Sequence, residues 1–595
     1  MCRIGGIVSK KHSQAELRHN VTLMCDVLKH GGPDDGGIYS AETVHLVFGH
    51  RRLSIIDLTA NGHQPMADVE QKACITFNGE IYNYRELKEQ LIKLGAGFHS
   101  DTDTEVIIQA YLHWGIEAFG KLRGMFAFAL YDKSKALTYL VRDSSGVKPL
   151  YYHSAGGQLT FASEIKAIKV SGIRVYENPE WPVKFLAYGH IPEPYTTLKD
   201  VYSLPKGNLL CWNHQTGAAE ITPYLQLAAN NIVTNVAEAR YHIKKGLTVA
   251  VKRQLIADAH IGVFLSGGID SSLLTLLAAA EKKQDLKTVS IFFDESAYDE
   301  RAYQQEIFNK IGGEKFTHLV KQQDFDAFFP DVLNAMDMPT TDGINSWFIS
   351  KYARQDGLKA VLSGIGADEL FGGYPSFNRI GYLKYLRSLP KALIKALATS
   401  ADDKYRRLLF LTTDHPLADY LFLRGLFAPS KIAALLNCDE AQIYQILFEG
   451  DSPVTFRDYT PETASLLETN LYMQNQLLRD TDVMSMSHGL EVRVPFLDED
   501  FQKTINSISP QIRFIKKQHK KILIDTFNDI LPEAVWDRPK MGFSFPLQQW
   551  MSNHPAIADQ SFYKNKTAKS VITNFRNNKL HWSKAFALYQ LQNHV

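Results

Sequence analysis

The sequence predicts two domains of different fold classes: an α+β domain with stacked antiparallel sheets between helices, then an α/β domain with a doubly wound parallel sheet and a helical C-terminal part. The 595 residues exceed what one hydrophobic core can hold, since cores stop growing at roughly 250–300 residues. Short apolar runs separated by turns come first, and strands that alternate with helices follow. We place the domains at residues 2–215 and 236–595, because no strong periodicity appears between Gln215 and about Asn235.

The N-terminal domain is predicted from short apolar runs that alternate with turn residues. Strands are expected at residues 44–48, 73–77, 126–131 and 137–141, with hairpin turns at Asp132-Lys133-Ser134 and Ala155-Gly156-Gly157. A helix is expected after Asp103-Thr104-Glu105, because apolar residues then recur at helical spacing. This mixture indicates antiparallel sheets with helices packed on them.

The C-terminal domain is predicted from strands that alternate with helices. Residues 261–265 form a continuous apolar run typical of a buried parallel strand, and a leucine-rich helix follows. Further strands are expected at residues 287–293, 315–320 and 360–362, with a helix near residues 300–311. In a doubly wound sheet of this kind, ligands bind at the carboxyl ends of the strands. Beyond Tyr374 we expect mostly helices, because leucine and alanine dominate.

Composition argues against several classes of partner. The chain has 65 basic and 64 acidic side chains, so its net charge of +1 gives no sign of nucleic-acid or membrane-surface binding. No apolar run approaches the ~18 residues of a membrane helix. The N-terminus lacks the apolar region of a signal peptide, so a cytoplasmic location is expected. Five scattered cysteines indicate neither a disulfide framework nor a zinc site.

Cys2 is a candidate nucleophile because removal of the initiator methionine makes it the first residue. The α-amine of a terminal cysteine, with an ordinary pKa of about 7.7–8.0, can be the base that its thiol needs to attack a carboxamide. A cysteine at position 2 also occurs by chance. The interpretation therefore depends on the motifs that follow it.

A glycine-rich turn at Ser266-Gly267-Gly268-Ile269-Asp270-Ser271 is a candidate phosphate site. It lies between a predicted strand and a predicted helix, where backbone N–H groups and the positive end of the helix dipole attract phosphate. The lysine of a G-x-x-x-x-G-K-[ST] loop is absent, which disfavours γ-phosphate transfer. The pattern resembles the loop of ATP pyrophosphatases, which bind the β,γ-pyrophosphate of ATP and release it as a unit.

Three motifs follow Cys2 in order: His50-Arg51-Arg52-Leu53-Ser54-Ile55-Ile56-Asp57, Asn78-Gly79-Glu80-Ile81-Tyr82-Asn83 and Ser100-Asp101-Thr102-Asp103-Thr104-Glu105. Together with Cys2 they resemble the glutaminase domain of class II glutamine amidotransferases, an N-terminal nucleophile hydrolase fold, over about the first 210 residues. The resemblance implies that Cys2 attacks the side-chain amide of glutamine while the Asn78 side chain and the Gly79 N–H bind the oxyanion. It also implies that Arg52 and Asp103 bind the α-carboxylate and α-ammonium of glutamine, and that Glu80 belongs to the same site. The alternative interpretations are a surface arginine in a strand for Arg52 and a helix N-cap for Asp103.

The remaining motifs resemble the synthetase domain of glutamine-hydrolysing asparagine synthetases. They are Ser363-Gly364-Ile365-Gly366-Ala367-Asp368-Glu369-Leu370-Phe371-Gly372-Gly373-Tyr374, residues 477–486, residues 491–498 and Arg538-Pro539-Lys540-Met541-Gly542-Phe543. The resemblance implies that ATP is bound by Leu265, Ser266, Gly267, Gly268, Asp270, Ser271, Ile291, Ser363 and Gly364. It implies that Asp270 and Asp368 bind Mg²⁺. Lys540 would neutralise charge on the acyl-adenylate and the departing pyrophosphate.

The resemblance implies that ATP adenylates a carboxylate, which ammonia from glutamine then attacks, giving an amide, AMP, pyrophosphate and glutamate. Aspartate is the default acceptor. Ile365, however, stands where synthetases that use aspartate often have an acidic residue, and an alkyl group does not pair with an ammonium. Either another group recognises aspartate, or the acceptor is a different carboxylate, such as a sugar acid or a peptide. Gly31 also departs from the family, which usually has arginine there.

Three other functions are alternatives. A relative that closes a lactam or macrolactam would need no glutaminase. The presence of all the glutaminase motif residues, Cys2, Arg52, Asn78, Gly79 and Asp103, argues against it. An RNA-modifying ATP pyrophosphatase should show a basic face, which the net charge of +1 does not suggest. A regulatory protein without catalysis would not need both sites. A homodimer is one assembly that the chain could form, and an ammonia tunnel between the sites is a hypothesis from the resemblance.

Overall fold

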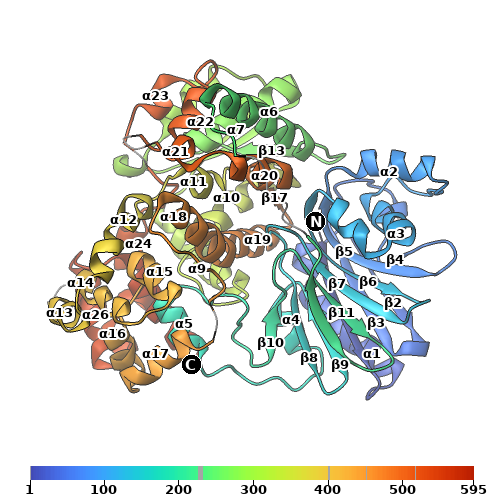
Figure 1. Cartoon of the computed structure of the whole chain (residues 1–595), viewed down its shortest axis with the longest axis horizontal. Coiled ribbons are helices and arrows are strands. Elements are labelled where there is room, and N and C mark those ends of the chain that lie inside the picture. Colours follow the sequence, from blue (N-terminus) through green and yellow to red (C-terminus); the bar gives the residue numbers. More distant parts are fainter. Residues whose placement is uncertain are drawn as a thin grey trace.

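Two antiparallel sheets and one parallel sheet organise the chain (Figure 1). The computed structural model describes residues 2–225, 232–399, 403–450, 452–515, 518–539 and 541–594. Both antiparallel sheets belong to the N-terminal part and the parallel sheet to the C-terminal part, so the predicted fold class is confirmed. Among the described helices, none is both long and apolar enough to cross a membrane.

The first antiparallel sheet has Cys2 on an inner strand. Its order is β10-β8-β9-β1-β3-β2. Strand β1 (Cys2–Ser9) pairs with β3 (Leu46–Arg52), and this register places Cys2 opposite Arg52. The other strands are β2 (Asp35–Ala41), β8 (Tyr151–Ala155), β9 (Gln158–Ala162) and β10 (Val201–Ser203). Every residue of β1 is buried, because one face of the sheet meets helices and the other meets the second sheet.

The second antiparallel sheet carries the Asn78-Gly79-Glu80 motif. Its order is β12-β11-β7-β6-β5-β4. The motif lies near the end of β5 (Ala73–Ile81), which pairs with β6 (Gly124–Asp132). The other strands are β4 (Met66–Ala67), β7 (Leu137–Arg142), β11 (Asn208–Asn213) and β12 (Ala219–Pro223). Strand β12 lies in the segment that the sequence left between the two predicted domains.

Helices cover the outer face of each antiparallel sheet. On the first sheet lie α1 (Gln14–Val27) and α4 (Ile165–Lys169), and on the second lie α2 (Tyr84–Lys93) and α3 (Asp103–Trp114). The cap of α3 is Thr102, whose hydroxyl accepts a hydrogen bond from the Glu105 N–H (3.1 Å). Asp103 is therefore the first residue of this helix and not its cap, which leaves its carboxylate for another role.

The parallel sheet places both nucleotide motifs at one edge. Its order is β15-β14-β13-β16-β17, and all four pairings are parallel. The neighbours of β13 (Ile261–Phe264) are β14 (Lys287–Phe292) on one side and β16 (Ala360–Leu362) on the other. The outer strands are β15 (Glu314–Leu319) and β17 (Glu491–Arg493). The strands that follow β13 in the chain are added first on one side of it, as β14 and β15, and then on the other side, as β16 and β17. Doubly wound folds bind ligands at such a switch point.

Helices flank the parallel sheet and form most of the chain beyond it. Those nearest the sheet are α6 (Val236–Gln254), α7 (Ile269–Lys282), α8 (Arg301–Phe308), α9 (Gln322–Ala335), α10 (Ile344–Gln355) and α11 (Ala367–Phe371). The C-terminal region includes α12 (Ser376–Arg387), α13 (Lys391–Ala398), α15 (Pro416–Arg424), α16 (Pro429–Leu436), α17 (Glu440–Phe448), α18 (Pro461–Leu467), α19 (Arg479–Met486), α20 (Glu499–Ser507), α22 (Lys521–Thr526), α24 (Leu547–Asn553), α26 (Lys566–Arg576) and α27 (Trp582–His594). Between α18 and α19 lies a π-helix, η8 (Glu468–Leu478), a form that frequently marks functional sites.

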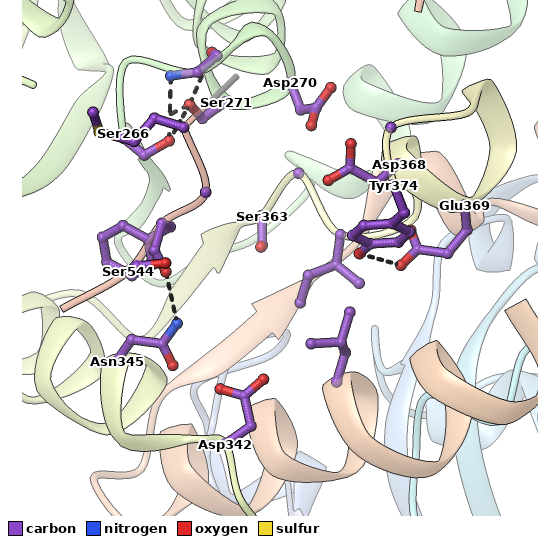
Figure 2. Close-up of a pocket in the computed structure, with 18 of the residues that line it drawn as sticks. Ser266, Asp270, Ser271, Asp342, Asn345, Ser363, Asp368, Glu369, Tyr374 and Ser544 are labelled. Carbon is purple, nitrogen blue, oxygen red and sulfur yellow. Dashed lines mark hydrogen bonds between the residues drawn. The ribbon is translucent and has the colours of Figure 1, made fainter. Parts of the chain in front are cut away.

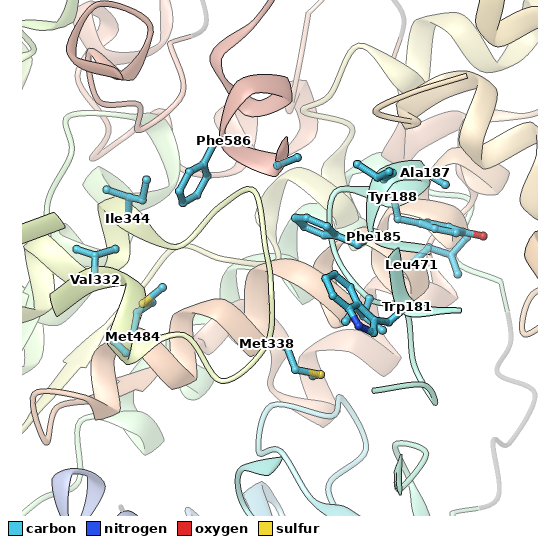
Figure 3. Close-up of a cluster of buried hydrophobic side chains, with 14 of the residues drawn as sticks. Trp181, Phe185, Ala187, Tyr188, Val332, Met338, Ile344, Leu471, Met484 and Phe586 are labelled. Carbon is cyan, nitrogen blue, oxygen red and sulfur yellow. The ribbon is translucent and has the colours of Figure 1, made fainter. Parts of the chain in front are cut away.

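One helix of the N-terminal region packs inside the C-terminal helices. Helix α5 (Trp181–Tyr188) inserts its aromatic side chains among Leu471 and Phe586 (Figure 3). The Leu426 N–H also donates a hydrogen bond to the backbone carbonyl of Ala187 (2.8 Å). The two halves therefore share one apolar core.

Buried charges add a second connection between the halves. Asp482 of α19 accepts hydrogen bonds from Arg3 (2.8 Å) and Lys148 (2.9 Å), and Arg3 also binds Glu164 (2.6 Å). Burial raises the pKa of Asp482, but Arg3 and Lys148 outweigh it and hold that pKa below its ordinary value. Removing one partner of such a network leaves an unpaired buried charge, which typically costs about 3–5 kcal/mol.

Candidate active sites

The predicted glutamine-site residues, except Asn78, line one small pocket. Those lining it are Cys2, Arg52, Gly79, Glu80 and Asp103, together with Gln64 and Thr102. They come from both antiparallel sheets and from the start of α3, so the stacking of the sheets assembles the pocket. Its volume of about 20 Å³ leaves room for about one water molecule, which needs roughly 10–15 Å³ of such space. The pocket is thus too small for a glutamine side chain unless part of its wall moves.

Asn78 holds the backbone nitrogen of Cys2. Its Oδ1 accepts a hydrogen bond from Cys2 N (3.2 Å), and its Nδ2 is buried without a hydrogen-bond partner among the described residues. Gly79 adopts φ +153°, and a Cβ there would lie 2.1 Å from the Met125 carbonyl oxygen. Only glycine fits at this position. The structure thus brings the nitrogen beside the candidate nucleophile together with an unpaired amide donor.

Arg52 is buried, so it is not the surface arginine of the alternative interpretation. Its guanidinium donates hydrogen bonds to the carbonyls of Ile56, Asp57 and Thr59. Gly62 packs directly on it, because a Cβ there would lie 1.8 Å from Nη2. The loop after β3 is therefore packed against the guanidinium and holds it in place.

The acidic groups and the thiol of the pocket have shifted pKa values. Burial raises the pKa of Asp103 to about 6, although the Ile81 N–H bound to its carboxylate acts in the opposite direction. Burial also raises the pKa of the Cys2 thiol, which Arg52 partly offsets. A buried thiol needs a base to become a nucleophile, and this need fits a terminal amine beside it.

The space beside Gly31 is occupied by Arg3. A Cβ at position 31 would lie 2.7 Å from the Arg3 Cγ, so the stem of Arg3 fills the volume that a side chain there would take. The guanidinium of Arg3 continues into the buried network with Glu164, which His30 also joins (2.9 Å). Glycine at position 31 is therefore compatible with the packing around the first strand.

A second and much larger cavity, of about 1690 Å³, opens at the carboxyl edge of the parallel sheet (Figure 2). The predicted ATP and Mg²⁺ residues that line it are Leu265, Ser266, Gly268, Asp270, Ser271, Ser363, Gly364 and Asp368. Gly267, at φ +85°, belongs to the same loop but does not line the cavity. Ile291 lies buried in β14 and does not line it either. The sheet therefore brings both motifs to one cavity.

The loop from Ser266 to Ser271 is preorganised by its own hydroxyls. Ser271 Oγ accepts a hydrogen bond from Ser266 N (3.2 Å) and lies 2.9 Å from Ser266 Oγ. Helix α7 then begins after Gly268 without a side-chain cap. Its first amides thus have no capping acceptor, which is the arrangement that binds phosphate oxygens.

Lys520 joins the two carboxylates that the sequence predicted as metal ligands. Its Nζ lies 2.5 Å from Asp270 Oδ2 and 2.5 Å from Asp368 Oδ1. Burial lowers the pKa of Lys520, but the two carboxylates outweigh it and raise that pKa above its ordinary value. Sequence reasoning missed this residue, and its only signal was the basic run that contains Lys516, Lys517, Lys520 and Lys521. The carboxylates converge on one cation, and such hard oxygen donors also suit Mg²⁺.

The segment around the predicted lysine lies at the same cavity. Arg538, Pro539, Met541 and Gly542 line it, whereas Lys540 itself lies outside the described residues. Arg538 donates hydrogen bonds to the Gly267 carbonyl (3.0 Å) and to Glu300 (2.7 Å). This arginine was not predicted as a site residue. Through Gly267 it holds the backbone of the loop from Ser266 to Ser271.

Comparison with known proteins identifies the family. The asparagine synthase family model matches residues 242–577, and the glutamine amidotransferase domain model matches residues 1–225. Asparagine synthetase [glutamine-hydrolyzing] 1 of Bacillus subtilis is 31% identical over 574 residues, which cover 93% of this chain and 88% of that protein. The chain belongs to the asparagine synthase family. It is therefore an amidotransferase ligase with a glutaminase domain of the N-terminal nucleophile hydrolase class.

Other members of the family carry different names. Amidase chyE of Penicillium rubens is 28% identical over 605 residues, covering 92% of this chain and 88% of that protein. A putative asparagine synthetase of Mycobacterium tuberculosis is 30% identical over 573 residues, covering 90% and 85%. Membership of the asparagine synthase family therefore leaves the acceptor of this chain to be argued from its own residues.

In this member of the asparagine synthase family, Arg493 of β17 connects the two sites. Its Nη2 lies 3.5 Å from Glu80 Oε1 in the Cys2 pocket, and its Nε binds Glu491. Its backbone carbonyl accepts a hydrogen bond from Ser363 N (2.8 Å) at the nucleotide cavity. Burial raises the pKa of Glu80 well above its ordinary value, an effect that Glu491 increases and Arg493 opposes. Arg493 is, after Lys520 and Arg538, the third residue that sequence reasoning missed, although it lies in the segment 491–498 quoted for the resemblance.

Proposed function

We propose that this enzyme makes L-asparagine from L-aspartate, with glutamine as the nitrogen donor and ATP as the activating substrate. ATP transfers AMP to the side-chain carboxylate of aspartate and pyrophosphate leaves. Ammonia, released from glutamine as glutamate forms, then attacks the acyl-adenylate and expels AMP. The observation that carries this proposal is the presence, in one chain with a shared core, of a pocket around Cys2 and a cavity that contains both nucleotide motifs.

At the glutaminase site, the proposal assigns Cys2 as the nucleophile. The α-amine that methionine removal creates is the base, and Asn78 Oδ1 orients that nitrogen. Asn78 Nδ2 and the Gly79 N–H are the donors for the oxyanion, which fits the unpaired Nδ2 amide. Arg52 and Asp103 bind the charged groups of free glutamine after the loop releases the guanidinium.

At the synthetase site, the proposal assigns the loop from Ser266 to Ser271 to the pyrophosphate of ATP. Ser363 and Gly364 are assigned to the adenosine, and Lys520 and Lys540 to the negative charge that departs with pyrophosphate. Asp270 and Asp368 would hold Mg²⁺, whose contribution is to neutralise phosphate charge. In the described structure Lys520 supplies a positive charge between these carboxylates.

One residue favours a second candidate function, the amidation of another carboxylate, such as a sugar acid or a peptide. Ile365 lines the cavity directly after Ser363-Gly364 and offers an acceptor only an alkyl surface. Amidase chyE, which matches 92% of this chain, is a relative with a name other than asparagine synthetase. Under this alternative the glutaminase and adenylation chemistry are unchanged and only the acceptor differs.

The deciding experiment incubates the purified enzyme with glutamine, MgATP and aspartate and measures asparagine, AMP and pyrophosphate. Formation of all three in equal amounts is expected. Glutaminase activity without asparagine would exclude aspartate and favour the alternative acceptor. The Cys2→Ala variant should lose glutamine-dependent synthesis and keep ammonia-dependent synthesis, and loss of both would contradict the division into two sites.

A further inference from the structure

Part of the large cavity, called the second lobe below, is formed mainly by residues outside the predicted nucleotide motifs. Its walls come from α5, α15, the π-helix η8, α19 and the segment before α10. Its side chains include Asp342, Arg424, Tyr472 and Asp480, together with Glu369 and Tyr374 of the predicted motif at residues 363–374. The lobe is continuous with the edge at Ser363, where the acyl-adenylate of the proposed function would form. It is thus the part of the cavity left for an acceptor.

Arg424, the last residue of α15, is the positively charged side chain among the described residues of this lobe. Its guanidinium carbon lies 3.7 Å from the ring centre of Tyr472 and 4.6 Å from that of Tyr374. Nε pairs with Glu468 Oε2 (2.6 Å), the one ion pair of Arg424 in the described part of the chain. Two rings and a carboxylate therefore fix the guanidinium in place, while its Nη groups have no hydrogen-bond or ion-pair partner among the described residues.

Asp342 presents a negative group to the same lobe. Its Oδ1 accepts a hydrogen bond from Gly343 N (2.8 Å), which fixes the direction of the carboxylate. Figure 2 shows this carboxylate pointing into the cavity, toward the space between Ser363 and Tyr374. Burial raises the pKa of Asp342 and the positive charge of Arg424 lowers it, so the two groups interact across the lobe. The described structure contains no ion pair between them.

The other acidic groups of the lobe are engaged with neighbours. Glu369 accepts the Tyr374 hydroxyl hydrogen bond (2.7 Å), and burial raises the pKa of Glu369 to about 7. Asp480 binds Arg479 and the Thr340 hydroxyl, and burial raises its pKa to about 7. Among the charged groups of the lobe in the described part of the chain, Asp342 therefore has no ion-pair partner, and the ion pair of Arg424 uses its Nε.

We propose that Asp342 binds the α-ammonium and Arg424 the α-carboxylate of an amino-acid acceptor, which directs its side-chain carboxylate toward Ser363. Opposite charges at two ends of a lobe suit a zwitterion, and the same logic applies to Arg52 and Asp103 at the glutamine site. The assignment rests on the proposed function and deepens it. It explains how aspartate is recognised although Ile365 carries no charge.

Two analogues of aspartate test each contact separately. Succinate lacks the α-ammonium and β-alanine lacks the α-carboxylate, and both keep a carboxylate to adenylate. Acceptor-dependent pyrophosphate release gives kcat/KM for aspartate and for each analogue. The wild-type enzyme should prefer aspartate to either analogue by about 10²-fold, the factor expected when a charge-assisted hydrogen bond is lost.

The variants should lose one preference each. Asp342→Asn is expected to bring aspartate and succinate to within about threefold of each other, by raising KM for aspartate about 10²-fold with KM for ATP unchanged. Arg424→Leu is expected to bring the kcat/KM values of aspartate and β-alanine to within about threefold of each other. Arg407→Leu is the matched control, because Arg407 binds the Leu423 and Gly425 carbonyls beside Arg424 but does not line the cavity. This control should discriminate like the wild type.

The outcomes separate this assignment from the proposed function. If the wild type makes asparagine but both variants discriminate between aspartate and the analogues as the wild type does, the assignment is overturned and the proposed function stands. If all three variants, including the control, lose activity with every acceptor together, the residues are structural and the assignment is again overturned. Wild-type enzyme that releases no pyrophosphate with aspartate overturns both.

Discussion

The backbone carbonyl of Arg493 accepts a hydrogen bond from the backbone amide of Ser363 (2.8 Å), while the side chain of Arg493 reaches Glu80 in the Cys2 pocket. One residue thereby contacts a lining residue of the nucleotide cavity with its main chain and a lining residue of the Cys2 pocket with its side chain. Arg493 is fully buried, and its Nη1 also donates hydrogen bonds to the Gln254 and Ile256 carbonyls. A displacement of this residue would therefore act on both sites.

Replacing Arg493 by methionine should destabilise the folded enzyme. The change leaves the carboxylates of Glu491 and Glu80 buried without their counter-charge, which typically costs about 3–5 kcal/mol. Urea denaturation should show a clearly lower midpoint than for the wild type. Arg253→Met is the control, since its pair with Asp500 is partly exposed and such pairs contribute at most about 1 kcal/mol. Equal midpoints for the two variants would show that the buried charges do not need Arg493.

Replacing Lys520 by methionine should impair adenylation alone. The change removes the cation between Asp270 and Asp368, and loss of a group that stabilises developing charge typically costs about 10²–10³-fold in rate. AMP formation with ammonia should fall by about that factor, while glutamine hydrolysis continues. Lys521→Met is a matched control, because Lys521 is more exposed and pairs with Asp525 within α22. A Lys520 variant as active as this control would show that the lysine is only structural.

Sequence reasoning located the loops of both sites but not the groups that arrive from elsewhere in the chain. The phosphate loop follows from a local rule, because a glycine-rich turn between a strand and a helix exposes amides at a known edge. The Cys2 pocket needed the family resemblance, since Cys2 and Asn78 are 76 residues apart. Lys520 lies 250 residues from Asp270, and no local pattern brings them together.

The packing between the two halves of the chain could not be predicted from local sequence patterns either. The apolar run of α5 predicts a buried helix, but it does not say that the helix enters the C-terminal core and delivers Tyr188 to the synthetase cavity. The family resemblance implied that Ile291 belongs to the ATP site. Its side chain is buried and does not line the cavity, because the face of a strand is set by packing rather than by sequence position.

Glu369 should make the stability of the enzyme depend on pH. Burial raises its pKa from an ordinary value of 4.5 to about 7, so the folded state keeps a proton that the unfolded state has released. Stability should therefore fall as pH rises from about 4.5 to about 7, by up to about 3 kcal/mol from this group. Glu369→Gln retains an acceptor for Tyr374 and should gain stability relative to the wild type over that range. Denaturation curves at pH 5 and pH 7 test this, and the exposed Glu306→Gln change is the control. A difference between Glu369→Gln and wild type that does not change with pH would contradict it.

Gly373→Ala should act on adenylation through Asp368. A Cβ at position 373 would lie 1.6 Å from Asp368 Oδ1, so the carboxylate has to turn away from Lys520. Ammonia-dependent AMP formation should fall by about 10²-fold, with glutamine hydrolysis unchanged. Gly381→Ala in α12 is the control, because a Cβ there meets no atom within 4 Å and alanine favours the helix.

A double variant separates this route from a general disturbance of the turn. If Gly373 acts only by leaving room for Asp368, then adding Gly373→Ala to Asp368→Asn should cost much less than Gly373→Ala costs in the wild type, because both changes remove the same interaction. Additive losses of AMP formation would instead mean that alanine damages the loop independently of Asp368. Wild-type activity in the single Gly373 variant would show that the carboxylate position in this structure is not the one used for adenylation.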